Sequence, residues 1–199
     1  FIVVSGKGKI KNLSDLIKAS KKKALNWGVA QIGGTEHIAL ATFAKAAGIK
    51  YKVVPFGSGG KMVQALVSGG IDATLPNVSE VGDRVNDGTF KALAVMSEKR
   101  LGGYPKVPTT FENGFKVKGS TTRGYWVLKG TPKSAIKILS KGMIKAMKHK
   151  VFAAYLNNSG LSVKASVAGP KIWNAHIKSE YNNAYSALKE LGLLKKKKK

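Results

Sequence analysis

The stretch LNWGVAQIGGTEH at residues 25–37 decides the fold, because it joins a short apolar run to a paired-glycine turn and a helix start. The apolar run predicts a strand over 25–29. The apolar spacing after the turn predicts a helix over 36–47, which Gly48 ends in the usual glycine position. A strand that passes through a glycine turn directly into a helix is the repeating unit of α/β folds.

The same order recurs twice further along the chain, in strand 51–54 with helix 61–68 and in strand 71–75 with a helix to about residue 86. Further strands are expected at 3–4, 91–95, 125–128 and 161–163, and further helices from Leu13, from Pro132 to Met147, at 151–158 and at 170–194. This alternation predicts a largely parallel sheet with helices on both of its faces.

Composition limits the functional classes. The chain has 199 residues, 43% of them hydrophobic, which suffices for one sizeable core or two small lobes. It has no cysteine, so disulfides and thiolate chemistry are excluded. The formal net charge is +25, from 35 basic and 10 acidic residues, and such a charge attracts nucleic acid or anionic surfaces nonspecifically. Only three of the basic residues are arginines, which argues against specific base readout. The run 195–199 is interpreted as a lysine tail.

Three turns between strand and helix are candidate anion sites: Gln31–His37 with its paired glycines, Phe56–Lys61, and Pro76–Ser79. A helix N-terminus offers unpaired N–H groups and a partial positive charge to an anion. Each turn taken singly is equally an ordinary glycine turn or helix cap, and neither the dinucleotide fingerprint nor the P-loop spacing is complete. Three such turns at the carboxyl ends of neighbouring strands favour a ligand-binding site at that edge of the sheet.

The sequence does not favour catalysis. The histidines at positions 37, 149 and 176 have no metal-ligand spacing, and no serine lies in a nucleophile-elbow pentapeptide. Asp72 is the one acid expected to be buried, within the strand that starts at Ile71. We therefore expect no enzyme activity, no metal and no cofactor.

Seven ordered stretches together resemble the receptor family of tripartite tricarboxylate transporters, the Bug-type solute-binding proteins. The resemblance covers nearly the whole chain and rests on residues 25–28 with 33–37, 53–56, 66–72, 91–95, 107–109, 123–124 with 129–132, and 188–192. It implies a two-lobed, type II periplasmic-binding-protein fold of the α/β class, with mixed, mostly parallel sheets. It also implies a periplasmic or other extracytoplasmic location, a small carboxylate ligand, transporter membrane subunits as partners, and a monomer.

The resemblance also implies a division of the chain. Residues 5–97 would form the second lobe, and 1–4 with 98–194 would form the rest of the first lobe. The family's first-lobe ligand loop would precede Phe1, so the N-terminal part of that lobe is expected to be missing. The expected ligand-binding residues are Gln31, Gly33, Gly34, Thr35, His37, Phe56, Ser58, Asn77 and, from the first lobe, Arg123.

Two other functions fit part of the pattern. The effector domain of a LysR-type transcription regulator shares the two-lobed fold and a similar length, and it would follow a helix-turn-helix segment. A basic protein that binds polyanions nonspecifically would explain the charge of +25 and would lose binding steeply with salt.

Overall fold

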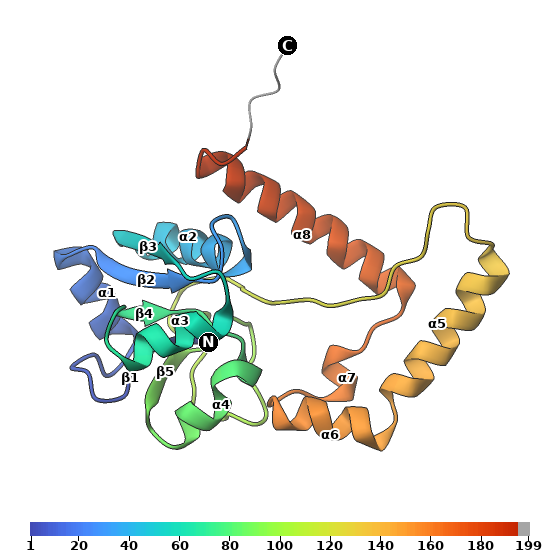
Figure 1. Cartoon of the computed structure of the whole chain (residues 1–199), viewed down its shortest axis with the longest axis horizontal. Helices are drawn as coiled ribbons and strands as arrows, with labels where there is room; N and C mark the ends of the chain where they lie inside the picture. Colours follow the sequence, from blue (N-terminus) through green and yellow to red (C-terminus); the bar gives the residue numbers. More distant parts are fainter. Residues whose placement is uncertain (195–199) are drawn as a thin grey trace, which may run out of the picture.

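A five-stranded mixed sheet forms the centre of the computed structural model, which describes residues 1–194 (Figure 1). The strands are β1 (Ile2–Ser5), β2 (Leu25–Val29), β3 (Tyr51–Pro55), β4 (Ala73–Thr74) and β5 (Phe90–Ala94), in the spatial order β3-β2-β4-β1-β5. β2 pairs in parallel with β3 and β4, whereas β1 runs antiparallel between β4 and β5. The sheet is therefore mixed, with β1 as the reversed strand.

Four helices of the sheet domain follow strands in sequence: α1 (Leu13–Lys22), α2 (Thr35–Ala47), α3 (Gly59–Val67) and α4 (Val78–Asn86). The remaining helices are α5 (Lys133–Met147), α6 (Lys150–Asn158), α7 (Val163–Ser166) and α8 (Pro170–Glu190). In Figure 1, α5 to α7 lie away from the sheet, and α8 returns across the top of it toward α2. The helices that the sequence predicted from 132, 151 and 170 are all present.

The core lies in two layers, one on each face of the sheet. On one face, Leu16 of α1 and Phe43 of α2 pack with Trp27 of β2 in one cluster of buried side chains. On the other face, Met62 of α3 packs in a second cluster with Phe90 of β5. Side chains alternate between faces along a strand, so successive residues of β1 supply both clusters. Because the strands are apolar almost throughout, both faces of the sheet must be covered, and helices cover both, as expected.

Two predicted strands are wrong. Residues 125–128 form an extended segment without strand pairing, and Leu128 is 86% exposed, because no described strand lies alongside to accept its backbone hydrogen bonds. The segment at 161–163 instead begins α7, where the side chain of Ser162 accepts from the backbone N–H of Ala165. A serine cap outweighed the apolar pattern there.

The last helix ends earlier than predicted. α8 stops at Glu190 rather than 194, because Gly192 adopts a left-handed φ of 69°. The N–H of Leu193 then bonds the Leu188 carbonyl, which closes the helix in a glycine-dependent turn. None of the helices in residues 1–194 is long and apolar enough to cross a bilayer.

A close backbone contact joins the sheet domain to the outer helices. Gly103 lies against Gly160, so a Cβ at position 103 would come within 2.7 Å of the Gly160 Cα atom. Tyr104 is buried beside this contact, and its ring stacks edge-on against Phe1 with centroids 5.0 Å apart. No side chain fits between the two glycine backbones.

We expect Gly103→Ala to lower the free energy of unfolding by about 1–3 kcal/mol, because the added methyl group forces two backbones apart. Gly102→Ala is the matched control, since nothing lies within 4 Å of a Cβ there. It should change the free energy by about 0.5 kcal/mol or less. Urea unfolding of both variants checks this, and equal losses in the two would contradict the account of the contact.

Candidate ligand-binding site

Three helix N-termini lie at one edge of the sheet. β3, β2 and β4 are adjacent and parallel, and their carboxyl ends lead into α3, α2 and α4 respectively. Backbone bonds hold the first two turns together, because the N–H groups of Phe56 and Gly57 donate to the carbonyls of Val29 and Ala30 at 3.0 and 2.8 Å. The structure therefore brings the three predicted turns to the same edge, where ligands of open α/β sheets bind.

The turn before α2 is built around Gly33, whose φ is 75°. Its N–H donates to Nδ1 of His37 at 3.0 Å, and the N–H of Gly34 donates to the Gln31 carbonyl at 3.1 Å. Both glycine N–H groups are thus used inside the turn. Gly34 is the N-cap, and no side chain caps this helix. Thr35 is exposed as the first helical residue.

The N–H groups that remain at this turn belong to Thr35, Glu36 and His37, the first three helical residues. Among the described residues, none of them has a hydrogen-bond acceptor. They point from the positive end of a 13-residue helix, so the turn can bind an anion through helix N–H groups rather than through glycine N–H groups. The His37 side chain fixes the turn by accepting the hydrogen bond from Gly33.

The imidazole of His37 is a buried, neutral acceptor. The side chain is 6% exposed, and burial lowers the pKa of His37 below its ordinary value of 6.5. Since Nδ1 accepts from Gly33, the neutral ring carries its proton on Nε2. Protonation would place two donors face to face and release the turn.

At the turn before α3, a serine side chain serves as the cap. Ser58 Oγ accepts from the Lys61 N–H at 3.4 Å, and Phe56 is half-buried behind the turn against the second core cluster. At the turn before α4, Glu80 Oε2 accepts from both the backbone N–H and the side-chain amide of Asn77, at 2.7 and 3.1 Å. The polar groups of Ser58 and Asn77 therefore already have partners within the chain.

Glu80 is a residue that the sequence analysis missed. A methyl group on Gly59 would overlap its carboxylate, so Glu80 lies across the starts of both α3 and α4. The Glu80 carboxylate thus lies between these two helix N-termini, where it bonds Asn77 rather than a helix N–H group. At the start of α2 the nearby carboxylate is that of Glu36, whose side chain lies beside Gly34. The signal was present in the sequence, since an Asn followed three residues later by Glu is a capping pattern.

Asp72 is exposed, contrary to the expectation of burial. Its carboxylate accepts from the Asn26 N–H at 2.7 Å, and its own N–H donates to the Asn26 carbonyl at 2.9 Å. Asp72 therefore holds the start of β4 to β2 at the edge opposite the three turns. Strand apolarity suggested burial, but β4 is only two residues long and Asp72 precedes it.

Arg123 lies in the extended segment that crosses back toward α8. Its neighbours touch that helix: Thr122 Oγ1 is 2.9 Å from Nε2 of His176, and Trp126 stacks edge-on with Trp173. A methyl group at Gly124 would overlap the Trp173 ring. Arg123 itself is exposed and forms no ion pair with another described residue.

The end of α8 packs on the turn before α2. A Cβ at Gly33 would lie 3.3 Å from Leu188 and 3.7 Å from Leu193, and Glu190 forms an ion pair with Lys45 of α2 at 2.9 Å. This contact joins the candidate ligand turn to the C-terminal helix. Sequence spacing alone gave no sign of it, because the two segments are about 150 residues apart.

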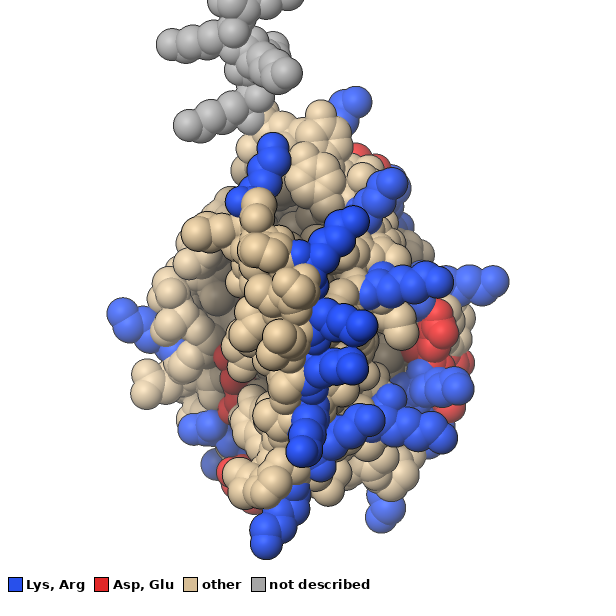
Figure 2. All heavy atoms as spheres, turned by 90° about the vertical axis from the view of Figure 1, so that its right-hand side faces the viewer, with Lys and Arg blue, Asp and Glu red and all other residues tan. Residues whose placement is uncertain are grey.

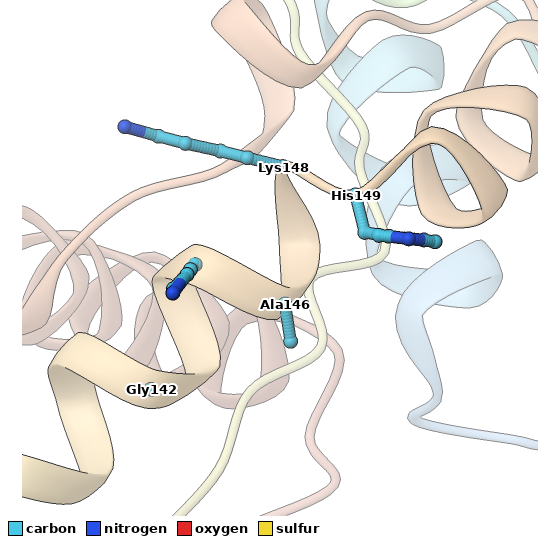
Figure 3. A pocket seen from close by; sticks show the side chains of 5 residues that line it. Gly142, Ala146, Lys148 and His149 are labelled. Carbon is cyan, nitrogen blue, oxygen red and sulfur yellow. The ribbon is translucent and has the colours of Figure 1, made fainter.

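Two hollows lie elsewhere on the molecule. One, of about 570 Å³, is lined by Gly142, Ala146 and the bend at Lys148 and His149, whose side chains point to opposite sides in Figure 3. The other, of about 400 Å³, lies between residues 100–103 and 157–165. Neither contains a predicted site residue. Within residues 1–194, no group of three His, Cys, Asp or Glu side chains could hold a metal ion.

Comparison with known proteins gives the same class as the fold. The family model described as "Tripartite tricarboxylate transporter family receptor" matches residues 1–193. A UPF0065 protein of Bordetella pertussis is 25% identical over 192 residues, covering 92% of this chain and 57% of its own length. The chain thus spans little more than half of that relative.

Solved structures show the same architecture. A TctC solute-binding protein from Polaromonas superposes with a TM-score of 0.80 at 26% identity, over 95% of this chain and 65% of that one. A protein from R. palustris solved with adipate superposes with a TM-score of 0.78 at 21% identity, over 96% of this chain and 64% of that one. MatC from Rhodopseudomonas palustris, with bound malate, superposes with a TM-score of 0.76 at 20% identity, over 94% of this chain and 65% of that one.

The fold is therefore that of a periplasmic solute-binding protein of the α/β class. The chain belongs to the receptor family of tripartite tricarboxylate transporters, a family of solute-binding proteins rather than enzymes. This confirms the family resemblance seen in the sequence.

His37 makes the stability of the turn depend on pH. Because burial lowers its pKa in the folded state, the unfolded chain binds the proton more tightly. The contribution of His37 is fully present above pH 6.5 and is lost as the pH falls below that value. His37→Asn keeps an acceptor near Gly33 without a titrating group, so it should remove this dependence.

His37→Leu should lower the free energy of unfolding by about 1–3 kcal/mol at neutral pH, because the Gly33 N–H loses its partner. Urea unfolding across pH 6.5 measures both effects. A wild-type pH slope that persists unchanged in His37→Asn would show that another group causes it.

Proposed function

We propose that the protein captures a small organic dicarboxylate in a cleft between two lobes, outside the cytoplasm, and presents it to the membrane subunits of a transporter. The ligand is held by hydrogen bonds and charge and leaves unchanged. No hydroxyl of the three turns is bonded to a base among the described residues, and the one hydroxyl–imidazole contact described above, Thr122 with His176, lies at α8, which supports binding rather than catalysis. As a monomer, each molecule carries one such cleft.

The observation that carries this proposal is the open start of α2. Its first three N–H groups are unpaired among the described residues, with the Glu36 side chain of the same turn beside them, whereas the Glu80 carboxylate lies between the starts of α3 and α4. One ligand carboxylate binds at Thr35–His37, with the Thr35 hydroxyl as a further donor and Gln31 beside it. Phe56, Ser58 and Asn77 border the site and hold the neighbouring turns, while Gly33 and Gly34 shape the backbone.

A second carboxylate is bound from the other lobe. Adipate and malate, the ligands in two solved structures with this fold, each carry two carboxyl groups. The sequence placed residues 1–4 with the other lobe, but β1 lies between β4 and β5 in the sheet. We therefore assign residues 1–97 to one lobe and 98–194 to the other, so that Arg123 approaches the ligand from the opposite side. Arginine binds a carboxylate in a bidentate manner. The first-lobe loop would come from a segment before Phe1, which fits relatives that are longer than this chain.

The family assignment favours this receptor function over the effector domain of a transcription regulator. Nonspecific attraction of polyanions by the charge of +25 is compatible with transport, but it would not require the arrangement at α2.

Thr35→Val tests the position of the site. A hydrogen bond to a charged group contributes about 1.5–3 kcal/mol, so removing the hydroxyl should weaken dicarboxylate binding about tenfold or more. Isothermal titration of the full-length protein with malate and adipate measures this. Thr35 is exposed and Gly34 caps the helix, so the substitution should leave stability unchanged.

Thr42→Val is the matched control, because Thr42 lies on the same helix, is exposed, and bonds only the Ile38 carbonyl. It should bind as the wild type does. Equal affinities in all three proteins would remove α2 as the site, and no heat with either diacid would contradict the proposed ligand class.

A further inference from the structure

The net charge of the chain is unevenly distributed. Residues 113–179 contain thirteen basic and no acidic residues, a charge of +13, whereas residues 1–112 contain sixteen basic and eight acidic residues, a charge of +8. About a third of the chain thus carries half of the net charge of +25. The difference comes mainly from the absence of acidic residues in 113–179, so the lysines there have no carboxylate neighbour within that stretch of sequence.

Within this segment, five lysines share one side of α5. Their spacing of three or four residues brings them onto one face of the helix. They are Lys133, Lys137, Lys141, Lys145 and Lys148. We call this set the α5 lysine row. All five side chains are exposed, and none is in an ion pair with another described residue. Figure 2 looks onto this side of the molecule, where basic side chains form a band and acidic ones lie toward the margin.

The row has the dimensions and surroundings of a surface contact. α5 is 15 residues long, or roughly 22 Å, and it lies at the outside of the molecule (Figure 1). Lysines at this spacing form the basic polar face of an amphipathic helix, the kind of face that is attracted to anionic lipid.

The chemistry of the row favours a fluid anionic surface over a structured partner. Lysine is a compact, hydrated charge without the fork that binds a fixed carboxylate or a base edge bidentately. Each lysine near an anionic leaflet contributes about 1 kcal/mol through the surface potential. The hollow between Gly142 and His149 lies at the end of the row, so Lys145 and Lys148 border a space open to solvent (Figure 3).

From this geometry we infer that the α5 lysine row is a docking face for a bilayer rich in anionic phospholipid. The face is separate from the ligand turn at α2. It holds the receptor at the membrane by long-range attraction, which salt weakens. The contact is reversible, because it rests on charge that salt screens.

Vesicle flotation with the full-length protein tests this inference. The variant reverses three lysines of the row, K137E/K141E/K145E, and the control reverses three exposed lysines of α1, K18E/K21E/K22E. Both change the net charge equally, and α1 lies at the opposite end of the molecule in Figure 1. On phosphatidylglycerol vesicles, the α5 variant should bind at least about 100-fold more weakly than wild type. The α1 variant should bind within about threefold of wild type.

Replacing the same α5 lysines by Gln tests the result without reversed charges or a change in helix propensity, and circular dichroism checks that each variant is folded. Equal losses in the α5 and α1 variants would overturn the docking face in favour of diffuse attraction. Loss of binding on deletion of Lys195–Lys199 alone would also overturn it. Tighter binding to a random DNA duplex than to vesicles, weakened to the same extent by the α5 substitutions, would also overturn the docking face.

Discussion

The parallel pairing of β2 with both β3 and β4 determines where everything else in the candidate site lies. Because the three strands run in the same direction, the turns that follow them end at one edge, and the helices that begin there point their N–H groups the same way. Trp27 and Val29 of β2 are completely buried, so the strand cannot shift register without exposing them. The ligand edge is therefore fixed by the same contacts that form the core.

The three helix starts at this edge differ in the groups that lie against them or bond to them. Ser58 caps α3, Glu80 lies across α3 and α4, and both glycine N–H groups before α2 are used within the turn. At the first turn of α2, three N–H groups have no acceptor among the described residues, and the neighbouring carboxylate is that of Glu36 in the same turn. The contact of Leu188 and Leu193 with Gly33 adds a second constraint, because α8 cannot move without affecting that turn.

Much of this architecture could be predicted from the sequence, and the failures have specific physical causes. Strand and helix order up to residue 94 follows from apolar runs broken by glycine pairs, which are local signals. Residues 125–128 have the same apolar pattern as a strand, yet they remain unpaired, because pairing depends on a neighbour that local pattern cannot reveal. The site was predicted as three helix N-termini with their adjoining glycines and polar side chains. The roles of His37 and Glu80 depend on side-chain contacts made at the sheet edge, and only Glu80 had a sequence signal.

The most direct test of the account is backbone amide NMR of the isotope-labelled full-length protein, titrated with malate. The account predicts that the amide signals of Thr35, Glu36 and His37 shift together and saturate with one affinity. The amides of Val78 and Ser79 at the start of α4, where Glu80 already supplies the anion, should shift far less. Shifts confined to residues 142–149, or to the start of α4, would contradict the assignment of the ligand to α2.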